Sequence, residues 1–106
     1  MASPLFVDEL LGAYDSDWGP LTLSRAEGGT GLVGYYGRPS DPSRMGQGRL
    51  AGSVVGHRFI YVWAGDESGD QGRGYFERDE AGSGLTGRWG YGQSDADGGT
   101  WHARRL

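Results

Sequence analysis

The sequence contains no cysteine, no lysine and no asparagine among its 106 residues. Without cysteine there are no disulfides, no thiol nucleophile and no thiolate ligands for a metal ion. Without lysine, Schiff-base chemistry is excluded at every position except the N-terminal amine. All ten positively charged side chains are therefore arginines.

Long apolar runs and an excess of basic residues are also missing. No segment approaches the roughly 20 apolar residues of a membrane helix, and residues 1–11 lack the basic start and apolar core of a secretion signal. We therefore expect a cytoplasmic protein with no membrane partner. The net charge is −4, with the arginines scattered among fourteen acids. Because phosphate contacts need a basic face, we expect no nucleic-acid partner.

Glycine is abundant, with 22 copies, about three times its average frequency. A glycine two positions before an aromatic residue recurs at residues 12–14, 34–36, 74–76, 87–89 and 99–101. Residues two apart share a face of a strand, so each glycine leaves a gap in which a ring of the neighbouring strand can lie. The repeat predicts a meander of similar strands.

Turn residues separate these units at the spacing expected of short antiparallel strands. The chain is predicted to form one domain, residues 1–106: an all-β, eight-stranded antiparallel up-and-down β-barrel with a short N-terminal helix over 4–11. The predicted strands are residues 12–17, 19–26, 30–37, 48–55, 57–65, 71–79, 83–91 and 98–105.

The only long connection is the twelve-residue loop 37–48, which contains Pro39 and Pro42. Loops of this length in a compact domain are often functional. We expect it to lie over one end of the barrel, although a surface insertion without a role explains its length equally well.

The segment 12–36 resembles the opening of the avidin and streptavidin family. It contains Gly12-Ala13-Tyr14, the turn around Trp18-Gly19, an alternating strand, and Gly31-Leu32-Val33-Gly34-Tyr35-Tyr36. The resemblance implies an eight-stranded meander barrel whose loop between strands three and four closes over a ligand, and the loop 37–48 falls at that connection.

The residues that bind biotin in that family are largely not matched. Its ring-binding asparagine and serine fall on Ser16 and Pro20, its tyrosine is kept as Tyr36, and the next serine falls on Arg38. Because proline has no hydroxyl, biotin is not the expected ligand. More broadly, the Gly12-Ala13-Tyr14 opening together with the late Arg104-Arg105 pair resembles lipocalins, of the calycin type. This second resemblance implies that Arg104 or Arg105 packs on the ring of Tyr14 or Trp18.

The segment 57–65 shows which face of the strands turns inward. His57, Phe59, Tyr61 and Trp63 share one face, whereas Arg58, Ile60 and Val62 share the other. With the aromatic face inside, Ile60 and Val62 lie outside, where a second copy of the chain could cover them as a homodimer.

The interior is then rich in rings and leucines. An eight-stranded barrel is just wide enough to be filled by side chains or to hold one small ligand, and both alternatives stay open. The residues expected inside are Tyr14, Leu21, Leu23, Leu32, Tyr36, Leu50, Val54, Phe59, Tyr61, Trp63, Phe76, Leu85, Trp89 and Trp101.

If a cavity exists, we expect it at the end nearest the long loop. Tyrosine hydroxyls and an indole N–H would orient a flat or apolar ligand there. The candidate ligand-binding residues are Tyr14, Tyr36, Arg38, Tyr61, Trp63, Trp89 and Trp101.

Candidates for catalysis are few. Glu77 would become an inward carboxylate only if the phase of its strand were inverted, and His57 and His102 are typical of surface positions. No metal ligand set and no cofactor motif occurs, so neither a metal nor a cofactor is expected.

Three classes of function fit this sequence. The first is a barrel that binds a small aromatic or apolar molecule in an aromatic-lined cavity under the loop 37–48. The second is a cofactor-independent enzyme of the cyclase or isomerase type that uses the same cavity. The third is a lectin-like or protein-interaction module that uses outer-face Tyr35 and Tyr75 and the acidic turns. An inward ionisable side chain favours the second class, and a fully packed interior favours the third.

Overall fold

The computed structural model describes residues 7–27, 31–37, 47–65, 69–79, 84–94 and 97–106. Within them the predicted fold is confirmed: eight antiparallel strands form a closed barrel in up-and-down order, preceded by a short helix. The elements are α1 (Val7–Leu10), β1 (Gly12–Ser16), β2 (Gly19–Arg25), β3 (Leu32–Tyr36), β4 (Gly48–Val55), β5 (Arg58–Gly65), β6 (Gln71–Arg78), β7 (Gly84–Tyr91) and β8 (Gly99–Arg105).

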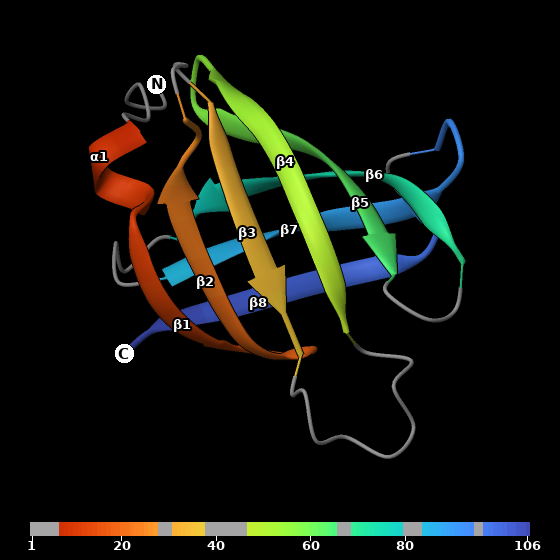
Figure 1. Cartoon of the computed structure of the whole chain (residues 1–106), viewed down its shortest axis with the longest axis horizontal. Coiled ribbons are helices and arrows are strands. Elements are labelled where there is room, and N and C mark those ends of the chain that lie inside the picture. Colours follow the sequence, from red (N-terminus) through yellow and green to blue (C-terminus); the bar gives the residue numbers. More distant parts are fainter. Residues whose placement is uncertain (1–6, 28–30, 38–46, 66–68, 80–83, 95–96) are drawn as a thin grey trace.

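The barrel closes where its first strand meets its last. β1 pairs with β8 through Tyr14 opposite Arg105 and Ser16 opposite Ala103, so neither strand is left as an open edge. Figure 1 shows α1 and the C-terminus together on the left, while β5 and β7 run toward the right. One end of the barrel therefore carries α1, and the other end carries the turns at which β5 and β7 end.

The strands alternate between core and solvent with the expected period of two. In β5, Phe59, Tyr61 and Trp63 are buried, whereas Ile60 and Val62 are exposed. The predicted inside-outside phase of this strand is confirmed.

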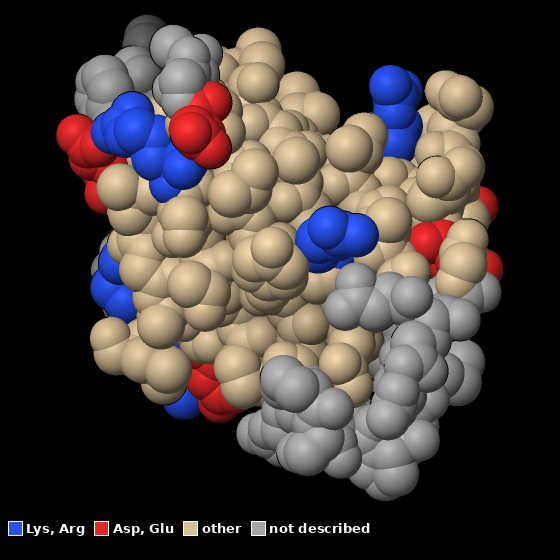
Figure 2. Space-filling model, viewed as in Figure 1, with Lys and Arg blue, Asp and Glu red and all other residues tan. Residues whose placement is uncertain are grey.

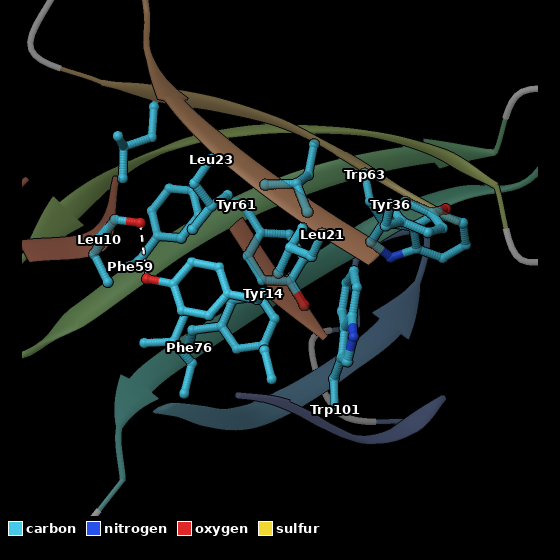
Figure 3. Packing of buried hydrophobic residues seen from close by; sticks show 14 residues of the cluster. Leu10, Tyr14, Leu21, Leu23, Tyr36, Phe59, Tyr61, Trp63, Phe76 and Trp101 are labelled. Carbon is cyan, nitrogen blue, oxygen red and sulfur yellow. Dashed lines mark hydrogen bonds between the residues drawn. The ribbon is translucent and has the colours of Figure 1, made fainter. Parts of the chain in front are cut away.

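One buried cluster fills most of the barrel (Figure 3). Val54 and Trp89, which were expected inside, are only partly buried and pack against the cluster, while Leu10 and Ala103 also belong to it. The cluster is Leu10, Tyr14, Leu21, Leu23, Leu32, Tyr36, Leu50, Phe59, Tyr61, Trp63, Phe76, Leu85, Trp101 and Ala103.

The glycines act as the repeat predicts where β5 meets β6. Tyr61 pairs with Gly74 across these strands, and a Cβ atom at Gly74 would overlap the ring and hydroxyl of Tyr61. The missing side chain therefore gives the tyrosine ring its place against the barrel wall.

α1 closes one end of the barrel. Leu10 inserts into the core, and its carbonyl accepts a hydrogen bond of 2.8 Å from the Tyr14 hydroxyl. Arg105 donates to the carbonyls of Leu11 (2.9 Å) and Glu9 and to the Tyr14 hydroxyl (2.9 Å). These bonds satisfy carbonyls that the end of a helix leaves without partners.

Two ion pairs join the same helix to the barrel wall. Arg25 of β2 pairs with Asp8, and Arg78 of β6 pairs with Glu9. Exposed ion pairs contribute little to stability individually, but these two fix the helix against two different strands.

The outer face over β2 to β5 is mostly uncharged, interrupted by arginine side chains (Figure 2). Its exposed apolar residues are Val33, Tyr35, Val55, Ile60 and Val62. In the described part of the chain, no helix combines the length and apolar character required to cross a membrane.

Candidate ligand pocket

A pocket of about 90 Å³ opens at the end of the barrel opposite α1. Six of its lining residues are aromatic and the seventh is a carboxylate: Trp18, Tyr36, Trp63, Asp70, Trp89, Tyr91 and Trp101. All four tryptophans of the chain therefore line this one pocket.

The barrel strands bring the rings together because three of them come from strand ends at this side. Tyr36 closes β3, Trp63 lies near the end of β5, and Tyr91 closes β7. Trp18 is in the turn between β1 and β2, and Asp70 directly precedes β6. Neighbouring antiparallel strands end at alternate ends of a barrel, so these positions converge.

Glycines again allow a large ring to cross the sheet. The indole N–H of Trp63 reaches over β6 and donates a hydrogen bond of 3.0 Å to the carbonyl of Gly90 in β7. A Cβ atom at Gly72 would overlap both that carbonyl and the indole nitrogen. The absence of a side chain at Gly72 therefore orients Trp63, with its polar atom bonded to the barrel wall.

Trp89 is the centre of the ring contacts at the pocket. Its ring lies edge-to-face with Trp18 (5.4 Å, 86°), Trp63 (5.6 Å, 82°) and Tyr91 (5.2 Å, 68°). Each such pair contributes about 0.5–1.5 kcal/mol beyond the burial of its area. The pocket walls are therefore preorganised and stand at steep angles to one another.

Trp101 forms the boundary between the pocket and the packed core. Its ring contacts Tyr36 on the pocket side and Phe76 and Tyr61 on the core side, at centroid distances of 5.2, 5.0 and 5.9 Å. Figure 3 shows Tyr36, Trp63 and Trp101 at one end of the cluster and Leu10 and Tyr14 at the other.

Two buried polar atoms next to this boundary have no hydrogen-bond partner in the structure: the Trp101 indole nitrogen and the Tyr61 hydroxyl. Both atoms are inaccessible to solvent, so the accessible wall of the pocket presents ring carbons rather than these donors. Burial, with a smaller contribution from nearby Tyr36, raises the pKa of Tyr61 well above its ordinary value.

The structure divides the predicted ligand-binding residues into three groups. Tyr36, Trp63, Trp89 and Trp101 lie together around the pocket. Tyr61 lies in the core beside the pocket, and Tyr14 lies at the opposite end, bonded to Leu10 and Arg105.

Arg38 and most of the loop 37–48 lie outside the described residues.

The contact predicted from the lipocalin resemblance is present at the closed end. The guanidinium carbon of Arg105 lies 5.0 Å from the ring centroid of Tyr14. Burial raises the pKa of Tyr14, although the charge of Arg105 and its hydrogen bond act in the opposite direction.

The candidate catalytic residues lie away from the pocket. The inward orientation considered for Glu77 is wrong, because Phe76 occupies the inward position of β6 and Glu77 pairs outside with Arg58 at 2.6 Å. His57 lies 3.6 Å from the same carboxylate, in the turn between β4 and β5. His102 is exposed and contacts Asp17 at 3.1 Å.

Sequence reasoning missed three lining residues: Trp18, Asp70 and Tyr91. Tyr91 shares the inward face of β7 with Trp89, two positions earlier, so strand periodicity could have identified it. Trp18 and Asp70 lie outside the strands, where no periodicity predicts the direction of a side chain.

Two of the positions that the resemblance places at the biotin site of avidin, Ser16 and Pro20, have other roles. The Ser16 hydroxyl donates to the carbonyl of Gly19 (2.6 Å) and accepts from the Trp18 amide (3.2 Å), which holds the turn that carries Trp18. Pro20 faces outward. Among the described residues, no group of three or more His, Cys, Asp or Glu side chains could hold a metal ion.

Comparisons with protein-family models, with curated proteins and with solved structures found no match to this chain.

Proposed function

We propose that this protein is a small-molecule-binding barrel that holds an apolar or aromatic group of its ligand in the pocket opposite α1. The observation that carries the proposal is the convergence of six aromatic rings around an accessible space of about 90 Å³. Binding sites for small molecules are typically concave, apolar and largely preformed.

The exposure of these rings supports the same proposal. Trp18 is 37% exposed and Tyr91 is 48% exposed, although both belong to the ring network around Trp89. Aromatic surface left in contact with water is costly, and a contiguous exposed patch often marks a binding site. A ligand seated here would remove that surface from water.

The two other classes of function have less support. For an enzyme of the cyclase or isomerase type, the described lining of the pocket offers one carboxylate, Asp70, and neither a histidine nor a glutamate. A lectin-like surface would use Tyr35, which is 62% exposed on β3, but Tyr35 is not one of the rings that gather around the pocket.

The test is a ligand-observed NMR screen of small aromatic and branched aliphatic compounds, including biotin, against the full chain. We expect several compounds to bind, biotin not to be preferred, and binding to be lost in Trp89→Leu. Tyr35→Leu serves as the control, because it removes an exposed ring on the outer face and should bind like the wild type. Failure of every compound to bind, or equal binding by Trp89→Leu, would contradict the proposal.

A further inference from the structure

We infer that the group held in this pocket is a compact alkylated cation, such as a trimethylammonium headgroup. The inference rests on the proposed function and specifies the chemistry of the ligand. It starts from the charge at the pocket: among the lining residues that the structure describes, Asp70 is the only charged one, beside six rings.

The charge of the surrounding turns has the same sign. The described connecting residues at this end are 17–18, 37, 47, 69–70, 92–94 and 97–98, and they contain Asp17, Asp70 and Asp97 but no arginine. Asp97 accepts a hydrogen bond from the Tyr91 amide at 2.8 Å, which places its carboxylate beside a pocket residue. These described connections therefore contribute only negative charge at this end, which favours a cation over an anion.

The ring geometry favours a compact group over a flat one. The contacting ring pairs at the mouth meet at 68–86°, so none of these pairs offers two parallel faces. A planar ligand stacks best between parallel faces. An approximately spherical cation can instead contact several faces at once, where the negative charge of each ring face attracts it.

The volume and the donors agree with this assignment. About 90 Å³ is less than the roughly 150 Å³ of an apolar cavity known to hold benzene, so the pocket has room for a single small group. The Trp63 indole N–H is already bonded to Gly90, and that of Trp101 is inaccessible. The tryptophans on either side of the pocket therefore present ring faces and edges to a ligand.

The decisive experiment compares choline with 3,3-dimethyl-1-butanol, which has the same shape but a neutral carbon in place of the nitrogen. Binding is measured by ligand-observed NMR at constant ionic strength, because salt screens the interaction. We expect choline to bind at least about tenfold more tightly, the difference expected of a partly desolvated cation–π site. Equal binding of the two compounds overturns the cation inference and leaves the proposed function intact, whereas binding of neither, together with failure of the aromatic panel, overturns both.

Variants separate the charge from the shape of the site. Asp70→Asn should weaken choline binding about threefold to tenfold and leave the neutral analogue unchanged. Asp15→Asn is the matched control, since Asp15 is an exposed carboxylate outside the pocket and its loss changes net charge equally. Equal effects of the two substitutions would show that only the overall charge matters and would overturn the role of Asp70.

Trp18→Leu tests the ring wall with little risk to folding, because Trp18 lies in an exposed turn. It should weaken choline binding more than binding of the neutral analogue.

Trimethyl-lysine in a peptide presents the same trimethylammonium headgroup as choline. A short peptide containing trimethyl-lysine therefore forms a second arm of the experiment. Choline binding as tightly as the peptide supports a small-molecule ligand. Much tighter binding of the peptide supports the cation site but overturns the proposal that the ligand is a small molecule.

Discussion

The two ends of this barrel are closed in different ways. At the α1 end, Leu10 fills the interior. Tyr14 donates a hydrogen bond to the carbonyl of Leu10, and Arg105 donates to the carbonyls of Glu9 and Leu11. At the other end, aromatic rings meet at steep angles around an accessible space, and Trp18 and Tyr91 remain in contact with water. At the closed end, polar groups thus find hydrogen-bond partners within the chain, whereas the pocket end leaves apolar surface in contact with water. This difference is expected of a binding site, where exposed apolar side chains are kept for the ligand at a cost in the stability of the fold.

The largest expected effect contrasts a ring of the packed core with a ring of the pocket. Phe59 is fully buried, so Phe59→Ala should cost about 3–5 kcal/mol in the free energy of unfolding. Trp89→Ala should cost clearly less, because Trp89 is only partly buried. Urea unfolding measures both values, and an equal loss in the two variants would show that Trp89 belongs to the structural core.

Removing the arginine that fastens α1 should have the next largest effect. Arg105→Gln deletes hydrogen bonds to Leu11, Glu9 and Tyr14 and should destabilise the fold by about 1–3 kcal/mol. Arg104→Gln is the control, because the neighbouring side chain is exposed and should change stability by less than about 0.5 kcal/mol. Indistinguishable unfolding curves for the two variants would argue against Arg105 as the fastening residue.

Two tyrosine hydroxyls provide a smaller and more selective contrast. Tyr14→Phe removes a hydroxyl bonded to Leu10 and Arg105 and should cost about 1 kcal/mol. Tyr61→Phe removes a buried hydroxyl without a partner, so it should be neutral or stabilising. A cost for Tyr61→Phe similar to that of Tyr14→Phe would mean that the Tyr61 hydroxyl is satisfied in solution.

The smallest expected effect is the contribution of these two tyrosines to the pH dependence of the free energy of unfolding, which is absent near neutral pH. Burial raises both pKa values above the ordinary value of 10.0, so the folded state retains protons that the unfolded state loses. Their stabilising contribution is therefore complete below pH 10 and is lost as the pH rises through the folded-state pKa values.

Unfolding free energies measured between pH 8 and pH 11 should remain level and then fall above pH 10. The fall should be smaller in Tyr61→Phe. A stability that does not change up to pH 11 would contradict the burial of these hydroxyls.

Much of the fold could be predicted from the sequence because strand periodicity and glycine spacing are local signals. The alternation in β5 predicted which side of Phe59, Tyr61 and Trp63 faces the core, and the glycine repeat predicted similar neighbouring strands. The glycine repeat occurs in β1, β3, β6, β7 and β8. Together with the alternation it was sufficient for the architecture.

The site could be predicted only in part, because periodicity indicates direction but not depth along the barrel. Tyr14 and Trp63 both face inward, yet they lie at opposite ends, since their depths depend on the register between strands and on strand tilt. Asp70, the one charged residue in the described lining of the pocket, lies outside any strand, where nothing local in the sequence indicates the direction of its side chain.

The central claim is that the aromatic end of the barrel, and not its outer face, receives the ligand. Because all four tryptophans line the pocket, their indole N–H resonances in a ¹⁵N-correlated NMR spectrum report on this end alone. Titration with tetramethylammonium should shift these indole signals in a saturable manner and leave the amides of α1 and of Val33, Ile60 and Val62 unchanged. Shifts confined to the outer-face amides, or indole signals that do not respond to tetramethylammonium or to the aromatic panel, would contradict the claim.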